Sequence, residues 1–189
     1  MGFKFNRYFD EFPTYEGEKI RLRELRLSDA EALLAYYNNP MVYRYLDWYG
    51  PTDSKMAEDV LNHWINGYEK GYILRFAIAD RETDQIIGTI FLTDVSESKA
   101  EMGYELDERY WRKGIMTEAM NEVIRLAFNK LGIIRLQAIV SEENEASQKI
   151  LEKMGFMKEG LLRQYECHMV TGACKDMLMY SLLKTEYEA

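Results

Sequence analysis

The sequence lacks any long apolar segment. No apolar run approaches the roughly 20 residues that a membrane-spanning helix needs. The first residues, Met-Gly-Phe-Lys-Phe-Asn at 1–6, contain neither the apolar stretch nor the cleavage pattern of a secretory signal. We therefore expect a cytoplasmic protein with no membrane partner.

An excess of positive charge is also missing. The formal net charge is −8 at pH 7, whereas proteins that bind nucleic-acid phosphates are usually basic. The sequence thus predicts no nucleic-acid partner. The acidic balance has two interpretations: it keeps the protein soluble, or it attracts cationic partners such as amines.

Cysteine and histidine are scarce. Cys167, Cys174, His63 and His168 have no spacing that fits a zinc site, so we expect no metal. The two cysteines flank a Thr-Gly turn signal at 171–172 and can face each other across a hairpin. We nevertheless expect no disulfide, because nothing in the sequence directs the chain to an oxidising compartment.

Strand and helix patterns occupy most of the chain. Alternating apolar and charged residues over 18–27 predict a half-buried strand. Ser28 and Glu31 form a capping box that predicts a helix start, and Asn39-Pro40 predicts its end. The elements expected after it are a helix over 53–66, strands over 73–79, 85–95 and 100–107, a helix over 115–131, a strand over 134–140, a short helix capped by Asn144, and strands over 157–168 and 174–184.

This order of elements indicates one mixed α/β (α+β) domain over 18–189. An aromatic-rich arm over 1–17 precedes it and is expected to dock on the domain or on another subunit, so a homodimer is one assembly that we consider.

A basic loop leads directly into the helix expected at 115–131. Free backbone N–H groups at a helix start attract anions, and Gly114 lets the backbone approach a bulky ligand closely. Arg109, Arg112 and Lys113 add positive charge, so the segment predicts a diphosphate site. It has neither the P-loop spacing nor the dinucleotide fingerprint. By itself it equally fits a solvated loop with an ordinary helix cap.

A second informative segment covers 144–156. Asn144 is placed to cap a helix, Ser147 lies one turn inside it, and Gly155-Phe156 turns the chain into the next strand. Alone, this is also the pattern of an ordinary capped helix.

Together the two segments resemble the GNAT superfamily of acyl-CoA N-acyltransferases. Within it, they are most similar to the branch of ribosomal-protein N-terminal acetyltransferases and spermidine acetyltransferases. Residues 101–119 carry Gly-Tyr, Trp-Arg-Lys-Gly and Thr-Glu-Ala in that branch's order, and 144–156 carry Asn-x-x-Ser followed by Glu-Lys-x-Gly-Phe. The resemblance extends over about 18–184 and implies a mixed, mostly antiparallel twisted sheet flanked by helices.

The resemblance implies acetyl-CoA as co-substrate. The strands at 100–107 and 134–140 would splay to admit pantetheine, which would pair with the main chain from Tyr104 to Leu106. The amides of 112–117 would hold the diphosphate. The implied cofactor-binding residues are Tyr104, Leu106, Trp111, Arg112, Lys113, Gly114, Ile115, Met116, Thr117 and Asn144.

The sequence departs from the family pattern at two positions. Arg112 replaces a glycine that is common in the loop, which reduces backbone freedom but adds a cation. Leu151 stands where many members carry a tyrosine that acts as general acid. The resemblance therefore gives the role of acid to Ser147 or to water.

Amine acetylation requires a base as well as an acid, because amines are largely protonated at neutral pH. Glu101 and Glu105 lie on the strand expected beside the thioester and share one of its faces. Glu108 is a third candidate, just past the strand. Each could instead be a solvated surface carboxylate, and Ser147 could simply bond a backbone carbonyl.

The acceptor is an amine of undetermined identity. Asp47, Trp48 and Tyr49 lie in a region that lines the acceptor pocket in this family, and they suit a cation. They could also be loop residues whose aromatic rings pack on the core, an interpretation that we slightly favour. Asp176 and Tyr180 are weaker candidates for the same pocket. We predict an acetyl-CoA-dependent N-acetyltransferase acting on a protein N-terminal α-amine or a small amine such as a polyamine. The alternatives are a non-catalytic acyl-CoA-binding module and a nucleotide-binding protein.

Overall fold

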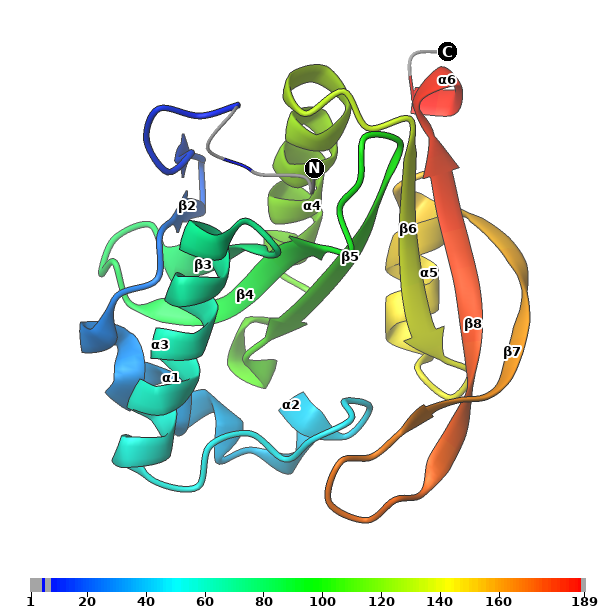
Figure 1. Ribbon diagram of the computed structural model, residues 1–189. Coiled ribbons are helices and arrows are strands. Elements are labelled where there is room, and N and C mark those ends of the chain that lie inside the picture. The colour runs from blue at the N-terminus through cyan, green and yellow to red at the C-terminus, as the bar shows by residue number, and fades with distance from the viewer. Residues whose placement is uncertain (1–4, 6–7, 188–189) are drawn as a thin grey trace.

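A single twisted sheet forms the centre of the computed structural model, which describes residue 5 and residues 8–187 (Figure 1). Among these residues, eight strands lie in the order β1-β2-β3-β4-β5-β6-β8-β7. All of the described strand pairs are antiparallel except β5 with β6. This confirms the predicted mixed, mostly antiparallel sheet. The strands are β1 Tyr15–Glu16, β2 Ile20–Arg23, β3 Leu74–Asp80, β4 Ile86–Thr93, β5 Lys99–Leu106, β6 Arg135–Ser141, β7 Met157–Cys167 and β8 Cys174–Leu183.

Helices cover both faces of the sheet. α1 and α3 pack on one face through a cluster that includes Ala77 and Ile86 of the sheet, and α4 and α5 contribute to the larger cluster on the other. The helices are α1 Ala30–Tyr37, α2 Pro40–Tyr43, α3 Ser54–Lys70, α4 Ile115–Arg125, α5 Glu145–Lys153 and α6 Lys184–Tyr187, with 3₁₀ turns at Leu27–Asp29 and Glu108–Tyr110 and a π turn at Leu126–Lys130.

The predicted capping box of Ser28 and Glu31 is wrong. A 3₁₀ turn precedes α1, and the Asp29 carboxylate accepts the backbone N–H of Arg26 at 2.8 Å. The same carboxylate forms an ion pair at 2.8 Å with Arg23, whose side chain is only 4% exposed. A buried guanidinium needs such a partner, and this requirement determines how the chain enters the helix.

α3, the helix predicted over 53–66, extends to Lys70, four residues beyond its predicted end. Asp53 caps α3 by accepting the N–H of Met56 at 2.8 Å, as a helix start requires. Gly71, with φ of 85°, ends it in the left-handed conformation. Gly67 is buried inside the helix, where a side chain would collide with Ile73. This glycine therefore serves close packing rather than termination.

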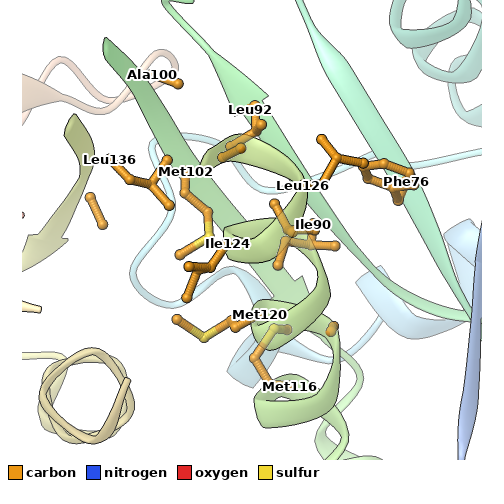
Figure 2. Packing of buried hydrophobic residues seen from close by; sticks show 14 of the residues in the cluster. Phe76, Ile90, Leu92, Ala100, Met102, Met116, Met120, Ile124, Leu126 and Leu136 are labelled. Carbon is orange, nitrogen blue, oxygen red and sulfur yellow. The ribbon is translucent and has the colours of Figure 1, made fainter. Parts of the chain in front are cut away.

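α4 supplies most of the core on its face of the sheet. Figure 2 shows Met116, Met120 and Ile124 of α4 directed at Met102 of β5 and at neighbouring strand residues. Met120 is completely buried. This packing fixes the start of α4 relative to the end of β5, which is where the site lies.

β5 and β6 are paired over only part of their length. Their parallel register ends where Glu101 lies opposite Gln137. β5 continues in register with β4 as far as Leu106, while β6 continues beside β8. Figure 1 shows the two strands running apart. From Met102 onward, one edge of β5 therefore has no strand partner in the described part of the chain.

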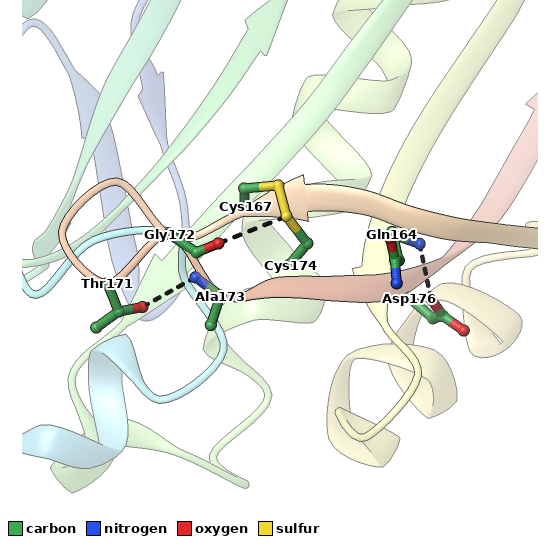
Figure 3. Close-up of a disulfide and its surroundings, with 7 residues drawn as sticks. All are labelled: Gln164, Cys167, Thr171, Gly172, Ala173, Cys174 and Asp176. Carbon is green, nitrogen blue, oxygen red and sulfur yellow. Dashed lines mark hydrogen bonds between the residues drawn. A yellow bond between two sulfur atoms is a disulfide. The ribbon is translucent and has the colours of Figure 1, made fainter.

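The cysteine prediction is also wrong. Cys167 and Cys174 are opposite each other in the β7–β8 hairpin and form a disulfide (Figure 3). The hairpin register places the two residues side by side, and this local geometry was visible in the sequence. The argument from cellular compartment was given more weight than that geometry.

The N-terminal arm packs against the domain where it is described. Phe12 lies edge-on to Phe76 of β3 with ring centroids 5.2 Å apart, and Phe5 is fully buried in the larger core cluster. Part of the predicted arm, residues 1–4 and 6–7, lies outside the described residues. Within the described residues, no helix combines the length and apolar character needed to cross a membrane. The homodimer stays a prediction.

Replacing both Cys167 and Cys174 with serine is expected to lower the free energy of unfolding by about 2 kcal/mol, because the cross-link restrains the unfolded chain. Urea denaturation of the variant and of the oxidised parent measures this difference. Thiol titration under denaturing, non-reducing conditions should find no free cysteine in the parent. Full reactivity of both thiols would show that the bond is absent in solution.

Candidate active site

The loop before α4 has the conformation that an anion site needs. Arg112 and Gly114 have φ of 60° and 79°, in the left-handed region that glycine adopts most easily. The first backbone bond within α4 runs from the Glu118 N–H to the Gly114 carbonyl, and none of the described side chains caps this helix. The N–H groups of 115–117 are therefore available to an anion.

The cations around this loop differ from those inferred from the sequence. Arg112 and Lys113 are exposed, as expected. Arg109 instead donates to the Asp107 carboxylate at 2.6 and 2.9 Å, which neutralises it. Lys19, which the sequence reasoning did not consider, reaches the loop and donates to the Lys113 carbonyl at 2.8 Å. Lys19 therefore adds a cation from the start of β2.

The unpaired edge of β5 presents main-chain groups in a regular pattern. The Asp107 N–H donates to the Ile87 carbonyl at 2.8 Å, so residue 107 faces β4. Because alternate residues of a strand point their backbone groups in opposite directions, those of Tyr104 and Leu106 face away from β4. The Leu106 carbonyl accepts the indole N–H of Trp111 at 2.8 Å. Trp111 thus closes the end of this edge next to the anion site.

α5 brings two polar side chains to the same region. The Asn144 side chain accepts the Ser147 N–H at 3.1 Å, which confirms its role as the helix cap. The Ser147 hydroxyl lies 2.7 Å from the phenol oxygen of Tyr104 on β5. The sequence reasoning considered only the main chain of Tyr104 and missed this contact.

One cavity of about 650 Å³ reaches the β5 edge at Met102–Tyr104 and the start of α5 at Asn144 and Ser147, while the loop before α4 lies outside its walls. Its walls come from the α2–α3 region, from β5, from the part of β6 that has separated from it, from α5 and from the β7–β8 hairpin. Asp47 and Trp48 line it, and Trp48 also packs against a core cluster, whereas Tyr49 packs outside it on His168 with the two rings tilted. Its remaining carboxylates are Asp59, Glu101, Glu105 and Glu166, and its aromatic lining includes Tyr37, Tyr45, Trp64, Phe91 and Tyr165.

Glu105 lines the cavity but is engaged by neighbouring groups. Its Oε1 atom accepts the Thr89 hydroxyl at 2.5 Å and lies 3.3 Å from the Arg75 guanidinium. Arg75 is itself held between the rings of Trp64 and Phe91, at 4.0 and 3.7 Å. Burial raises the pKa of Glu105, and Arg75 and Thr89 oppose that rise. This arrangement is typical of a buried structural ion pair.

Glu101 is less constrained. It lies at the last position where β5 pairs with β6, and its Oε2 atom accepts the Gln137 amide at 3.1 Å. Burial raises the pKa of Glu101, the Gln137 hydrogen bond opposes the rise, and the Asp94 carboxylate adds to it. A carboxylate with a raised pKa is a stronger base at neutral pH.

Glu166 is a cavity residue that the sequence reasoning missed. It lies on β7 opposite Lys175, next to the disulfide. Burial raises the pKa of Glu166, with further contributions from the carboxylates of Asp47 and Glu101, while Lys175 lowers it. The one sequence signal for Glu166 is that it lies in the strand that follows the Gly155-Phe156 turn.

The comparisons with known proteins are consistent with this geometry. Residues 19–157 match the family model described as "Acetyltransferase (GNAT) domain". The chain belongs to the GNAT family of acetyl-CoA-dependent N-acetyltransferases. It is 38% identical over 176 residues to "Uncharacterized N-acetyltransferase p20" of Bacillus licheniformis, with 92% of this chain and 98% of that protein covered.

Solved structures of GNAT proteins have the same fold. The ribosomal-protein-S5-alanine acetyltransferase of Vibrio fischeri superposes with a TM-score of 0.72 at 26% identity, covering 91% of this chain and 97% of that one. The microcin C7 self-immunity acetyltransferase MccE, whose complex contains acetyl-CoA and AMP, superposes with a TM-score of 0.79 at 22% identity, covering 88% and 93%. At 22% identity, the similarity to MccE shows a shared fold only.

Many residues named from the sequence do not line the cavity of this GNAT protein: Leu106 and the loop and helix start at 111–117 lie outside it, as do Glu108, Asp176 and Tyr180. Glu108 accepts the Asn39 side-chain amide at 2.6 Å on the surface. Asp176 accepts the Gln164 N–H at 2.7 Å. Tyr180 is fully buried and donates to Glu152 at 3.1 Å. The described residues contain no group of three or more His, Cys, Asp and Glu side chains arranged to hold a metal ion.

Changing Arg112 to alanine is expected to weaken acetyl-CoA binding about three- to tenfold, because one exposed cation beside a phosphate contributes on the order of 1 kcal/mol. Isothermal titration calorimetry measures the dissociation constant, and the effect should shrink at high salt. Arg109→Ala is the matched control: its cation is paired with Asp107, so binding should change little. Equal losses from the two variants would contradict this assignment of the charges.

Proposed function

We propose that this GNAT enzyme transfers the acetyl group of acetyl-CoA to a primary amine of a cationic acceptor, by direct attack of the amine on the thioester. One observation carries the proposal: a single cavity joins the unpaired edge of β5 to a pocket lined by carboxylates and aromatic rings. The first part suits an extended thioester donor and the second suits a cation.

The donor would lie between the diverging strands. Its diphosphate would contact the N–H groups of 115–117 and the side chains of Arg112 and Lys113. The pantetheine arm would hydrogen-bond the main chain at Tyr104 and Leu106, in the manner of an added strand. The acetyl group would then lie near Met102, where β5 and β6 begin to separate. Gly114, in the left-handed conformation, supports this placement because it has no Cβ, which would lie 3.1 Å from the Lys19 Nζ atom beside the loop.

The acceptor amine must lose a proton before or during attack. A lysine-like amine has a reference pKa of about 10.4 and an α-amine about 8, so both are largely protonated at neutral pH. We assign Glu101 as the base, directly or through water, because it lies where the strands part and its pKa is raised. Glu166 is the second candidate. The Arg75 ion pair makes Glu105 less suited to this role.

Ser147 is the group nearest the expected position of the sulfur. Its hydroxyl would donate a hydrogen bond to the thiolate as the carbon–sulfur bond breaks. The start of α5 adds the positive end of a helix dipole to this region. Leu151, which lines the same cavity, offers no polar group.

Two classes of acceptor fit the cavity. An α-amine at a protein N-terminus is one, in keeping with the name of the Vibrio fischeri relative as a ribosomal-protein-S5-alanine acetyltransferase. A polyamine is favoured by the carboxylates of Asp47, Asp59 and Glu166, which can contact a second positive charge away from the reacting amine. The non-catalytic module considered from the sequence has no comparable use for these carboxylates.

An acetylation panel separates these possibilities. The purified protein, acetyl-CoA and either N-terminal peptides of ribosomal proteins or a series of diamines and polyamines are incubated, with mass detection of each product. Acetylated amine with matching release of free CoA supports the proposal. A panel that includes both classes and yields no acetylated product, although acetyl-CoA binds, would contradict it.

Replacing Glu101 with glutamine is expected to lower kcat by about 10²- to 10³-fold, the usual contribution of a general base. The base acts only when deprotonated, and burial raises its pKa. Wild-type kcat should therefore fall as the pH drops through that raised pKa, and the variant should lack this acidic limb. Steady-state kinetics across pH measures both effects.

Glu105→Gln is the matched control on the same face of β5. Because it breaks the Arg75 ion pair, it should mainly lower thermal stability and should retain the acidic limb. If Glu105→Gln removes the limb while Glu101→Gln keeps it, the two roles must be exchanged.

A further inference from the structure

Two hydroxyl groups meet across the opening between β5 and α5. The phenol oxygen of Tyr104 lies 2.7 Å from the Ser147 hydroxyl oxygen, which is the length of a good O–H···O bond. Both residues line the cavity. The contact joins a strand residue to the first turn of a helix that lies 43 positions later in the chain. It therefore depends on the fold and not on local sequence.

The distance alone allows either oxygen to donate, and the chemistry of the pair favours one direction. A phenol is a more acidic hydroxyl than an aliphatic alcohol, so Tyr104 is the better donor and Ser147 the better acceptor. Burial raises the pKa of Tyr104 to about 12, although the Ser147 contact opposes the rise. The phenol thus keeps its proton at neutral pH. With its oxygen accepting from Tyr104, Ser147 keeps its own hydrogen for another partner.

The helix cap restricts Ser147 further. Its backbone N–H is held by the Asn144 side chain at 3.1 Å, which fixes the serine at the start of α5. One bond therefore anchors the main chain and another anchors the hydroxyl oxygen. The Ser147 hydroxyl hydrogen can still rotate about its bond to the side chain. Because the hydroxyl oxygen accepts from Tyr104, this hydrogen is disfavoured from pointing toward Tyr104 on β5.

We propose that Tyr104 is a positioning residue for acetyl transfer, whose phenol donates to Ser147 and thereby directs the serine O–H at the sulfur of the leaving coenzyme. The inference rests on the proposed function. It adds a side-chain role to a residue whose main chain alone was considered for binding pantetheine.

The role is consistent with the bonds that form and break. The amine nitrogen bonds to the acetyl carbon, and its surplus proton goes to the base. The carbon–sulfur bond breaks, and its electron pair stays on sulfur. A thiol has a reference pKa near 8.5, so a thiolate can leave when a hydrogen bond stabilises it. Ser147 provides that bond without losing its proton. A chain of donors strengthens each of its members, so Tyr104 makes Ser147 a better donor.

The test is a double-mutant cycle on kcat. Tyr104→Phe keeps the ring and removes the hydroxyl, and is expected to lower kcat about 10- to 30-fold with the KM for acetyl-CoA unchanged within about twofold. Ser147→Ala should lower kcat at least as much. The double variant should resemble Ser147→Ala, because without the serine there is nothing for Tyr104 to direct.

Other outcomes would overturn the inference. They are a Tyr104→Phe kcat within twofold of wild type, losses that multiply in the double variant, or a change confined to the KM for acetyl-CoA. Thermal melting shows whether the variants fold. Tyr104→Met, which also lacks the hydroxyl and fills irregular space, replaces the Phe variant if that variant is unstable.

Two controls separate this inference from the proposed function. Ser147→Thr retains a hydroxyl, so it should keep most of the activity and its sensitivity to Tyr104→Phe. Loss of that sensitivity counts against the role of Tyr104. If the wild-type protein acetylates no amine, the proposed function itself is contradicted. If the wild type is active and the Tyr104→Phe variant is fully active, only the role of Tyr104 is contradicted.

Discussion

The separation of β5 from β6 after Glu101 is the constraint on which the rest of the site depends. Backbone N–H and C=O groups need hydrogen-bond partners, and a sheet that parts in its middle leaves the main chain at Tyr104 and Leu106 without a strand. A co-substrate with amide groups can occupy that edge. The helices follow from the same geometry, since α4 begins at one end of the opening and α5 beside it. In the proposed function, donor binding and the hydrogen bond from Ser147 to the leaving sulfur both depend on this one interruption in the sheet.

The electrostatics of the cavity divide its carboxylates by role. Glu105 is matched by Arg75, which is itself clamped between two rings, and this buried pair holds β3 and β5 together. Among the described cavity residues, Glu101 and Glu166 have no ion pair comparable to that of Glu105, and burial raises the pKa of both carboxyls. Outside the cavity, exposed cations lie near the start of α4. In the proposed function, the charges separate an anionic donor from a cationic acceptor within a chain of net charge −8.

The features predicted correctly from the sequence are those with local signals. Gly114 before a helix, Asn144 as a cap, and the shared face of Glu101 and Glu105 follow from helix ends and strand alternation. The features that were missed join distant parts of the chain. Lys19 reaches a loop 94 positions away, and Arg75 pairs with Glu105 from 30 positions away. The capping box predicted from Ser28 and Glu31 was wrong for the same reason. Buried Arg23 forms an ion pair with the Asp29 carboxylate, and that carboxylate shapes the turn before α1.

The central claim is that acetyl-CoA lies along the open edge of β5 with its diphosphate at the start of α4. Amide hydrogen exchange with and without acetyl-CoA tests it most directly. The account predicts that acetyl-CoA slows exchange at the N–H groups of Tyr104, Leu106 and residues 115–117, while the β7 edge strand exchanges at the same rate in both states. Unchanged exchange at those amides in the presence of bound acetyl-CoA would contradict it.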